Sequence, residues 1–365
     1  MNTPQTPIQQ VHVRKDALDR AELVHVEPME LAEGAVRLAI ESFSVTANNV
    51  TYAVVGDGFM YWDFFPAPDP YGIVPMWGHA RVVESKCPDI AVGERVYGYL
   101  PMATHLDVVP GKVSAGGFTD TSEHRQKMSP VYNQYSRLAA DPEHDAAREA
   151  ERMIFGPLFR TGFLIADFMK REGWFGAEQV LLTSASSKTA MGFASSARAG
   201  SPAVRRIGLT SKGNADFVKG TGLYDEVVAY DVLEEMERRP SVVVDFAGNA
   251  SLLGRVHAHF ADALTYSCLV GATHKDARST FGSEAEMKGP KPELFFAPDH
   301  MIAFARDHGR EEAARLFAAG WHRFLGEVED TVAIDRREGL SAAREVWLAM
   351  VAGKVDPARG IVIEP

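Results

Sequence analysis

Hydrophobic and polar positions follow two different rhythms along this chain. Between residues 14 and 109, apolar and polar residues alternate in short segments that Gly, Pro and Asp separate. A period of two predicts half-buried strands, here at residues 35–43, 80–84 and 93–99. Strands of this length and spacing predict a small barrel or a partly open sheet, so the first part of the chain is expected to be rich in β-structure.

From about residue 155 the pattern changes to alternating helices and strands. Continuous apolar runs predict strands buried on both faces, at residues 179–183, 206–210, 226–229, 241–245 and 263–270. The segments between these runs predict helices, at residues 159–170, 189–198, 214–219, 233–238 and 251–260. Ser251 is expected to cap the last of these helices. Strands that alternate with helices predict a parallel, doubly wound sheet.

The end of the chain resumes after the αβ unit is complete. This part of the sequence predicts helices at residues 299–318 and 340–352 and strands at residues 328–334 and 360–364. We therefore expect an α/β protein with two domains. The doubly wound domain comprises residues 156–319. The β-rich domain comprises residues 1–155 and is completed by residues 320–365.

Residues 111–152 are less regular than the rest and rich in charge. A stretch of this length without regular structure is unusual inside a compact domain. It is either a functional excursion, such as a lid over a site, or a surface insertion without a role.

Composition and charge exclude several classes of protein. The 365 residues are 46% hydrophobic and 24% charged, which is typical of a globular chain and not of a disordered or fibrous one. The net charge of −11 argues against nucleic acid or a membrane surface as a partner. Two distant cysteines, Cys87 and Cys268, make no disulfide framework and fit a reducing compartment. No apolar run could span a membrane and the N-terminus lacks a signal-peptide pattern, so we expect a cytoplasmic protein.

Five segments, taken in order, resemble the zinc-independent, quinone-oxidoreductase-like branch of the medium-chain dehydrogenase/reductase superfamily. They read WGHARVVESKCPDIAVGERVYGY (77–99), VLLTSASSKTAMG (180–192), VVVDFAG (242–248), TYSCLVGAT (265–273) and AGKVDPARGIVIE (352–364). The YWDFFP and YNQYSR segments resemble an uncharacterised offshoot of the DUF2855 type. The resemblance implies a GroES-like β-rich domain and a Rossmann domain that binds NADP(H).

The turn between the first strand and helix of the predicted Rossmann domain contains no glycine. Glycines usually let the backbone N–H groups of this turn approach the pyrophosphate of a dinucleotide. Small residues replace them here, so cofactor contacts are expected from Ser184, Ser186, Ser187, Lys188 and Thr189. Lys188 would place a cation on the pyrophosphate. The alternative is an ordinary turn with an exposed lysine. A P-loop is excluded because its glycines are absent.

The end of the second strand of this domain indicates which dinucleotide binds. A carboxylate there accepts from the ribose 2′-hydroxyl of NAD, whereas cations and hydroxyls bind the 2′-phosphate of NADP. This chain offers Thr210, Ser211, Lys212 and Asn214, with no acid before Asp216. The pattern favours NADP(H); the alternative is a solvated loop that contains a lysine. The resemblance adds four further cofactor-binding residues: Phe246, Gly248, Gly271 and Thr273.

The sequence argues against a catalytic metal. His79 stands where zinc-dependent relatives keep a ligand, but zinc catalysis needs about three protein ligands. The following position is Ala80 rather than a glutamate, and the upstream segment contains no cysteine. We therefore expect no metal site, and we expect His79 to be a hydrogen-bonded core histidine.

The candidate catalytic residues lie in residues 46–65. Residues 46–52 resemble a stretch that lies beside the nicotinamide in zinc-free relatives, which makes Asn49 a candidate. Those relatives place a tyrosine proton donor beyond this stretch; Tyr61, twelve residues after Asn49, and the nearer Tyr52 both fit. Aromatic residues crowd positions 59–65 and would either wall an apolar substrate pocket or form a hydrophobic cluster. The alternative for the two tyrosines is that both are wall residues.

The expected function is reduction of a small apolar carbonyl compound or activated alkene by NADPH without a metal, in a homodimer. The runner-up is a nucleotide-binding sensor or structural protein of the same superfamily that has lost turnover. A Ser-His-Asp hydrolase is excluded, because the chain has no G-x-S-x-G elbow.

Overall fold

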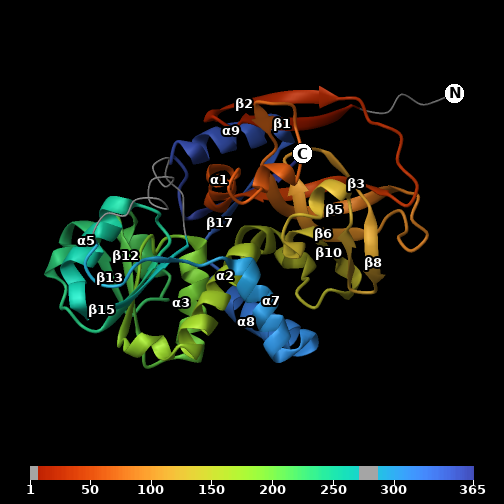
Figure 1. The fold of residues 1–365 in the computed structure, drawn as a ribbon. Coiled ribbons are helices and arrows are strands. Elements are labelled where there is room, and N and C mark those ends of the chain that lie inside the picture. The colour runs from red at the N-terminus through yellow and green to blue at the C-terminus, as the bar shows by residue number, and fades with distance from the viewer. Residues whose placement is uncertain (1–6, 271–286) are drawn as a thin grey trace. The chain divides into compact units, whose positions relative to one another are not determined.

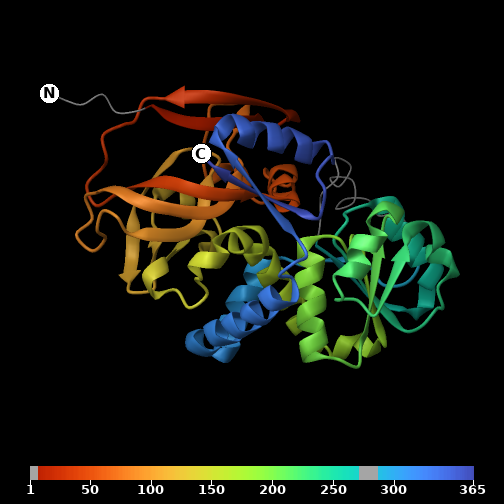
Figure 2. The ribbon, with the colours of Figure 1, turned by 180° about the vertical axis from the view of Figure 1, so that it is seen from behind.

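The computed structural model describes residues 7–270 and 287–365. The chain forms two compact units, which are considered separately. Unit 1 comprises Met1–Ile154 and Ile334–Pro365, and unit 2 comprises Phe155–Ala333. Figures 1 and 2 show the β-rich unit in red to yellow with the blue end of the chain, and the other unit mainly in green to light blue.

The strands of unit 1 form two sheets. A three-stranded sheet has the order β2-β1-β4, and a nine-stranded sheet has the order β17-β18-β3-β5-β6-β10-β9-β8, with β7 also paired to β3. Their bounds are β1 Ile8–Arg14, β2 Ala17–Val26, β3 Val36–Val45, β4 Tyr71–Gly72, β5 Pro75–Ser85, β6 Arg95–Pro101, β7 His105–Val108, β8 Pro110–Ser114, β9 Gly117–Asp120, β10 Gln134–Arg137, β17 Ala333–Glu338 and β18 Arg359–Glu364.

Few helices accompany these sheets. The α-helices α1 (Ala47–Val54) and α9 (Gly339–Val351) belong to unit 1, and Trp347 of α9 donates its indole N–H to the carbonyl oxygen of Leu18 in β2 at 2.9 Å. Short 3₁₀ helices cover η1 Tyr61–Asp63, η2 Glu123–Arg125, η3 Pro130–Asn133, η4 Leu138–Ala140 and η5 Ala146–Arg148. The end of the chain belongs to the first unit, where β18 pairs with β3.

The register between β5 and β6 places aromatic side chains together. Trp77 lies opposite Tyr99, and His79 lies opposite Tyr97. Residues two apart on a strand point to the same face, so these four side chains share one face of the sheet. Gly78 lies between them, where a Cβ atom would collide with the carbonyl oxygen of Ser42 on β3.

Unit 2 is a parallel sheet with helices on both faces (Figure 1). The six strands have the order β13-β12-β11-β14-β15-β16, which is the Rossmann order 3-2-1-4-5-6. Their bounds are β11 Gln179–Leu182, β12 Arg205–Thr210, β13 Glu226–Ala229, β14 Ser241–Asp245, β15 Leu264–Leu269 and β16 Glu293–Leu294. The α-helices are α2 Glu149–Arg171, which begins in unit 1 and enters unit 2 at Phe155, α3 Lys188–Gly200, α4 Ala215–Gly220, α5 Ala250–Phe260, α7 Ala297–His308 and α8 Arg310–Glu327. The 3₁₀ helices are η6 Gly173–Gly176, η7 Lys212–Asn214, η8 Tyr230–Glu235 and η9 Ala261–Ala263.

The unit boundaries differ from the expected domain boundaries. The first boundary lies one residue earlier, after Ile154, and the chain returns to unit 1 at Ile334 rather than at residue 320. Residues 320–327 belong to α8, and the Phe324 ring packs on the rings of Phe155 and Phe159 in unit 2, at 5.5 and 5.1 Å between centroids. This aromatic packing keeps α8 in unit 2.

The expectation of an irregular segment at residues 111–152 was wrong. Strands β8, β9 and β10 lie within it and extend the large sheet of unit 1. The strands are short, and a register shift between Gly111 and Ser114 interrupts the alternation of side chains that would have revealed β8. Helix α2 also begins at Glu149, ten residues before the expected start, because it continues through Pro157.

Other elements shift for local reasons. Asn249 rather than Ser251 caps α5, since its side chain accepts from the backbone N–H of Leu252 at 3.0 Å. The expected helix at 299–318 is two helices that break at Gly309, whose φ is 79°. The expected helix at 233–238 is the 3₁₀ helix η8, and the expected strand at 328–334 begins only at Ala333.

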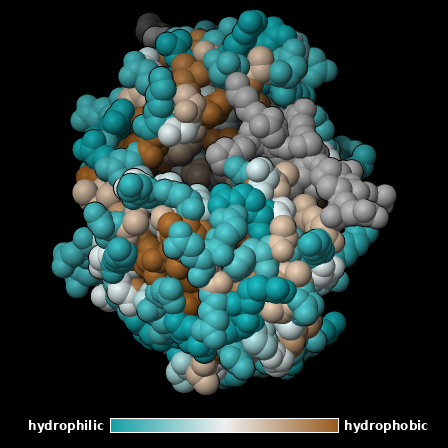
Figure 3. All heavy atoms as spheres, turned by 90° about the vertical axis from the view of Figure 1, so that its left-hand side faces the viewer, coloured by the Kyte–Doolittle hydropathy of each residue, from teal (hydrophilic) through white to brown (hydrophobic). Residues whose placement is uncertain are grey.

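The surface shows no extended apolar area on the face drawn in Figure 3, where hydrophilic side chains predominate and hydrophobic ones gather in limited patches. Within residues 7–270 and 287–365, no helix is both long enough and apolar enough to cross a membrane.

Candidate active site

The loop after β11 in unit 2 makes a tight turn into α3 without a glycine. Ser184 takes a φ of 48°, in the left-handed region that glycine usually occupies. Ser187 caps α3, because its side-chain oxygen accepts from the backbone N–H of Ala190 at 3.2 Å. The loop therefore delivers the chain directly into the N-terminus of α3, where helix geometry favours an anion.

Side chains from neighbouring segments hold this loop. The backbone N–H of Ser184 donates to the hydroxyl oxygen of Tyr230 at 2.9 Å. Tyr224 donates its hydroxyl to the carbonyl oxygen of Ala185 at 2.6 Å. Burial raises the pKa of Tyr230 to about 12, so this hydroxyl stays neutral at physiological pH. Tyr224 follows β12 and Tyr230 follows β13. Their hydrogen bonds fix the conformation of the loop backbone, which would be more flexible if it contained glycines.

A buried carboxyl group lies beside the start of the loop, where β11 and β14 end. The hydroxyl of Thr183 donates to Asp245 Oδ1 at 2.5 Å and accepts from the backbone N–H of Phe246 at 3.0 Å. Asp245 is 1% exposed, and its Oδ2 has no hydrogen-bond partner among the described residues. Burial raises the pKa of Asp245 to about 6. The group occupies the point where the strand order reverses, at which doubly wound sheets bind ligands.

The predicted cofactor residues fall into three groups. Those of the loop, Ser184, Ser186, Ser187, Lys188 and Thr189, lie together at the start of α3. Those after β12 lie beside the loop, since Asn214 Nδ2 donates to Ser186 Oγ at 3.2 Å. Thr210 is buried at the end of β12, while Ser211 and Lys212 are exposed beyond it.

The remaining predicted cofactor residues follow the carboxyl end of β14 or lie further on. Phe246 and Gly248 are buried after β14, and Gly248 has a φ of 61°. Gly271 and Thr273 lie outside the described residues.

In unit 1, aromatic side chains from distant parts of the chain gather on the face of β5 and β6. We call the following set the aromatic cluster: Tyr52, Tyr61, Phe64, Phe65, Trp77, Tyr97, Tyr99 and Tyr132. The ring centroids of Tyr52 and Tyr61 lie 4.6 Å apart, and those of Tyr99 and Tyr132 lie 4.8 Å apart. The two candidate tyrosines are thus brought together, each 6% exposed.

Two hydrogen bonds within the cluster join Tyr61 to Tyr132 and Trp77 to Tyr52, and the Tyr52 hydroxyl also interacts with the side chains of Asn48, Tyr99 and Tyr132. The hydroxyls of Tyr61 and Tyr132 lie 2.9 Å apart, and either oxygen can donate. The indole N–H of Trp77 donates to the hydroxyl oxygen of Tyr52 at 3.2 Å. Burial raises the pKa of Tyr52, Tyr61 and Tyr132 above the usual value, so these phenols are proton donors rather than bases at neutral pH.

Asn49 lies close to the cluster in sequence but is fully engaged. Its Oδ1 accepts from the backbone N–H of Thr46 at 2.6 Å, and its Nδ2 donates to the carbonyl oxygen of Pro75 at 2.8 Å. The side chain is 2% exposed. Its amide anchors the first turn of α1 to β5, and the catalytic role foreseen for it stays a prediction.

The aromatic run at residues 59–65 is largely a packed cluster. Trp62, Phe64 and Phe65 are each at most 4% exposed. A Cβ atom at either Gly56 or Gly72 would collide with the indole of Trp62. Of the two alternatives left open by the sequence, the hydrophobic cluster describes these three residues better than a pocket wall.

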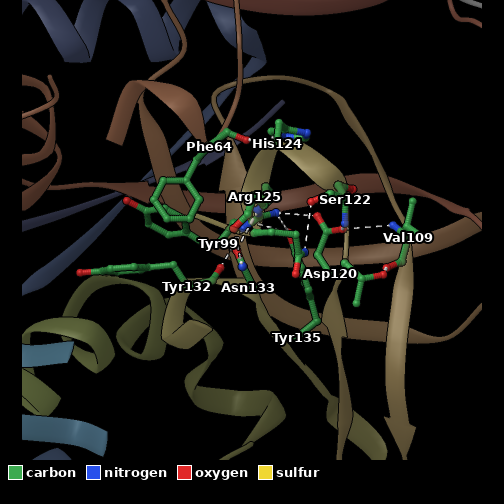
Figure 4. Close-up of polar contacts among 12 residues, drawn as sticks. Phe64, Tyr99, Val109, Asp120, Ser122, His124, Arg125, Tyr132, Asn133 and Tyr135 are labelled. Carbon is green, nitrogen blue, oxygen red and sulfur yellow. Dashed lines mark hydrogen bonds and ion pairs between the residues drawn. The ribbon is translucent and has the colours of Figure 1, made fainter. Parts of the chain in front are cut away.

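A buried ion pair supports the cluster from one side (Figure 4). Arg125 and Asp120, each with a side chain 1% exposed, form a salt bridge of 2.9 Å. Arg125 also donates to the backbone carbonyl oxygen of Tyr132 at 2.8 Å and to the hydroxyl of Tyr135 at 3.0 Å. Tyr135 in turn donates to the carbonyl oxygen of Tyr99 at 2.7 Å. The network thereby fixes the backbone that carries two tyrosines of the cluster.

Arg125 lies between aromatic rings of the cluster and its carboxylate partner Asp120 (Figure 4). In Figure 4 the rings of Phe64, Tyr99 and Tyr132 lie to one side of Arg125, and Asp120 lies to the other. The guanidinium carbon of Arg125 lies 5.3 Å from the ring centroid of Phe64, within the range of a cation–π contact. A cation held against the rings in a dry environment stabilises negative charge nearby.

His79 is buried, but it is not the hydrogen-bonded histidine that the sequence led us to expect. It is 0% exposed, and neither ring nitrogen has a hydrogen-bond partner among the described residues. The β5–β6 register turns it toward the ring of Tyr97, 5.1 Å away, whose face is covered by the Arg152 guanidinium at 4.1 Å. Burial lowers the pKa of His79 to about 3, so the imidazole is neutral.

The described residues contain no group of three or more His, Cys, Asp or Glu side chains that could hold a metal ion. The independence from zinc that the resemblance implies remains a prediction.

Sequence reasoning missed several residues of both regions. Trp77 directly precedes the Gly78-His79 pair, and the period of two along this strand could have shown that it shares a face with His79. Tyr132 lies in the YNQYSR segment, which the sequence connected only with the family resemblance. Arg125 and Tyr230 gave no sequence signal, because their roles depend on contacts with distant residues.

The chain belongs to the family described as "Protein of unknown function (DUF2855)", which matches residues 43–356. Its fold, a β-rich unit and a Rossmann-type unit, is also that of several solved oxidoreductases at low sequence identity. The structure of CurA from Vibrio vulnificus in complex with NADPH has a TM-score of 0.59 and 14% identity, and the match covers 98% of each chain.

Two other structures match in the same way. The yhdH oxidoreductase from Salmonella enterica in complex with NADP has a TM-score of 0.55 at 15% identity, with 98% of this chain and 99% of that chain covered. The quinone oxidoreductase from Coxiella burnetii has a TM-score of 0.55 at 15% identity, with 99% and 100% covered. No curated protein matches the sequence significantly.

Proposed function

We propose that this protein is an NADPH-dependent reductase that acts on a small, apolar carbonyl compound or activated alkene without a metal. The observation that carries the proposal is the glycine-free loop after β11, held in a dinucleotide-type turn within a Rossmann sheet. The fold shared with CurA and yhdH, whose structures contain NADPH or NADP, supports it. When bound, NADPH supplies the hydride.

The residues around the loop fit a dinucleotide. Backbone and hydroxyl groups of Ser186, Ser187 and Thr189 stand at the N-terminus of α3, where a pyrophosphate is stabilised. Lys188, in the first helical turn, adds a cation for the same group.

Lys212 would distinguish NADPH from NADH. It is exposed at the end of β12 with Ser211 beside it, and a charge-assisted hydrogen bond contributes about 1.5–3 kcal/mol. Lys212→Ala should weaken NADPH binding about tenfold or more and leave NADH binding unchanged, as measured by calorimetric titration. Lys219→Ala, at an exposed lysine of α4, is the matched control. Equal affinities for the two dinucleotides in the unmodified protein would refute this part of the proposal.

Lys188 would bind the part that both dinucleotides share. Lys188→Ala should therefore weaken NADPH and NADH alike. If only NADPH binding weakened, Lys188 would be assigned to the 2′-phosphate instead.

The aromatic cluster would supply the proton. Reduction of a polarised alkene or a carbonyl leaves a carbanion or an alkoxide that must be protonated, and a neutral phenol suits that role. Tyr52 and Tyr61 are the candidates; each Tyr→Phe variant keeps the ring and removes only the hydroxyl. Replacement of the true donor should lower kcat on the order of a hundredfold while the affinity for NADPH stays the same.

A second function has one observation in its favour. Tyr230 already accepts the backbone N–H of Ser184, so one loop donor is used before any ligand arrives. A nucleotide-binding sensor without turnover would tolerate such a loop. Stoichiometric NADPH binding without oxidation against a broad panel of enones, quinones and aldehydes would favour the sensor. A cytoplasmic homodimer remains our expectation, and sedimentation would test the dimer.

A further inference from the structure

The two candidate donors differ in how their hydroxyl groups are hydrogen-bonded. The Tyr52 oxygen accepts from the indole N–H of Trp77 at 3.2 Å. The Tyr61 oxygen lies 2.9 Å from the hydroxyl of Tyr132, and either of these two can donate. An indole N–H is a donor only, whereas a phenol both donates and accepts.

This difference decides where the hydroxyl hydrogens are. Because Trp77 can only donate, the hydrogen bond leaves the hydrogen of Tyr52 available for another acceptor. Within the Tyr61–Tyr132 pair, one hydrogen is used between the two oxygens, and the direction of the bond can reverse. Tyr52 is thus the phenol whose oxygen accepts from a fixed donor and whose hydrogen is not used in that bond.

The same hydrogen bond favours the charge that a donor must carry after it gives up its proton. Burial disfavours a phenolate and raises the pKa of Tyr52. Hydrogen bonds act in the opposite direction, first that of Trp77 and then those of Asn48, Tyr99 and Tyr132. A hydrogen bond to an ionised group is about twice as strong as one between neutral groups. The Trp77 bond therefore strengthens as negative charge develops on Tyr52.

The indole of Trp77 is held in place by neighbouring rings. It stacks on Tyr97 with 5.8 Å between centroids and an interplanar angle of 23°, and it contacts Tyr99 at 5.1 Å. Trp77 is half-buried, and Tyr52 is 6% exposed. The indole N–H of Trp77 is therefore held in position toward the Tyr52 oxygen before any substrate binds.

We propose that Tyr52 is the catalytic proton donor and that Trp77 is a positioning residue whose indole N–H holds the Tyr52 oxygen and stabilises the phenolate. The inference rests on the proposed function, because it assigns the proton of that reduction. The O–H bond of Tyr52 breaks, a C–H or O–H bond forms on the hydride-reduced substrate, and the phenolate regains a proton from water.

The hydrogen bond itself can be tested without substrate or cofactor. The chain has five tryptophans, so ¹⁵N-labelled indole N–H signals can be resolved and assigned by Trp→Phe variants. In Tyr52→Phe the Trp77 signal should move upfield and exchange faster with solvent. The Trp62 signal should stay where it is, because its indole nitrogen is buried without a hydrogen-bond partner among the described residues. An unchanged Trp77 signal would overturn the inference.

The catalytic role is tested with a matched pair of variants. Trp77→Phe should lower kcat about tenfold or more with little change in KM, and it should increase the solvent deuterium isotope effect on kcat, because proton transfer becomes slower. Trp62→Phe removes a buried indole of the same unit that makes no such hydrogen bond, so its kcat and isotope effect should match the unmodified protein. Tyr52→Phe should lose about a hundredfold in kcat, and Tyr61→Phe much less.

The outcomes separate the two levels of the proposal. An unmodified protein that reduces no member of the substrate panel overturns the proposed function and, with it, the role of Tyr52 as donor. An active protein in which Trp77→Phe and Trp62→Phe behave alike, or in which Tyr61→Phe is the inactive variant, overturns this inference alone. If Trp77→Phe fails to fold, the ratio of kcat between Tyr52→Phe and Tyr61→Phe still decides the donor.

Discussion

In unit 2 the residues proposed to contact the cofactor stand at successive positions of one loop and the strand end beside it. In unit 1 the aromatic cluster draws its members from α1, η1, η3, β5, β6 and the segments next to them. The loop is held by hydroxyl groups from the segments that follow β12 and β13, such as that of Tyr230 in η8. The cluster is held by a buried charge, Arg125, that donates to the backbone carbonyl oxygen of Tyr132 and, through the Tyr135 hydroxyl, is connected to that of Tyr99. A loop at the end of a regular sheet is thus held by a few hydrogen bonds to its backbone. A cluster assembled from distant segments is held by a buried ion pair, that of Arg125 and Asp120.

The largest effect is expected from the anchor of unit 1. Arg125→Met keeps the length of the side chain but leaves the buried Asp120 without its cation, which should cost about 3–5 kcal/mol of unfolding free energy in urea. Arg205→Met, at an exposed ion pair with Glu226 in unit 2, should cost no more than about 1 kcal/mol. Adding Asp120→Asn to Arg125→Met should recover part of the loss. Similar losses in the two Arg variants would remove the distinction between the regions.

The buried carboxyl group of unit 2 predicts a pH dependence with a definite sign. The pKa of Asp245 is raised to about 6 in the folded chain, so the folded state holds its proton more tightly than the unfolded state. Stability should fall as the pH rises from about 4 to 6. Asp245→Asn removes this dependence, and relative to the unmodified protein it should gain about 2–2.5 kcal/mol between pH 4 and pH 7. If the unfolding free energy of the two proteins changed with pH in the same way, the pKa of Asp245 would not be raised in the folded protein.

The buried histidine of unit 1 predicts the opposite sign. The pKa of His79 is lowered to about 3, so protonation favours the unfolded chain. The contribution of neutral His79 is complete above pH 6.5 and is lost as the pH falls toward 3. Relative to His79→Leu, the unmodified protein should lose about 2 kcal/mol between pH 7 and pH 5, as measured by urea unfolding. If the unfolding free energy of both proteins fell equally between pH 7 and pH 5, the imidazole of His79 would not be buried without a hydrogen-bond partner in the folded protein.

The smallest effect concerns the loop of unit 2. Ser184→Gly relieves the left-handed backbone at this residue and should stabilise the protein by about 0.5–1 kcal/mol, or leave it unchanged where the added freedom of the unfolded chain offsets the gain. Ser187→Gly, at the N-cap of α3 with an ordinary φ, should cost a few tenths of a kcal/mol. Thermal unfolding of both variants gives the comparison. A clear destabilisation by Ser184→Gly would show that the serine side chain, and not the backbone, sets the turn.

The sequence by itself determined that the chain has a β-rich part and a part with a parallel, doubly wound sheet, and it determined where the loop after β11 lies. Buried parallel strands are continuous apolar runs, and these fixed β11 to β15 to within two residues, because burial on both faces leaves no other pattern. The return of the chain end to unit 1 and the short polar residues at the start of α3 also came from the sequence. The polar turn depends on neighbours in sequence, which a composition records, whereas the return of the chain end was inferred from the order of the elements.

Only the tertiary structure decided how the aromatic side chains are used. Trp77 and Tyr52 are 25 positions apart, and Tyr61 and Tyr132 are 71 apart, so no period connects them. It also decided that His79 lacks a hydrogen-bond partner among the described residues, and that α8 stays with unit 2 through the packing of Phe324. A hydrogen bond, a buried charge or a ring contact depends on distances between segments that the chain brings together only when it folds.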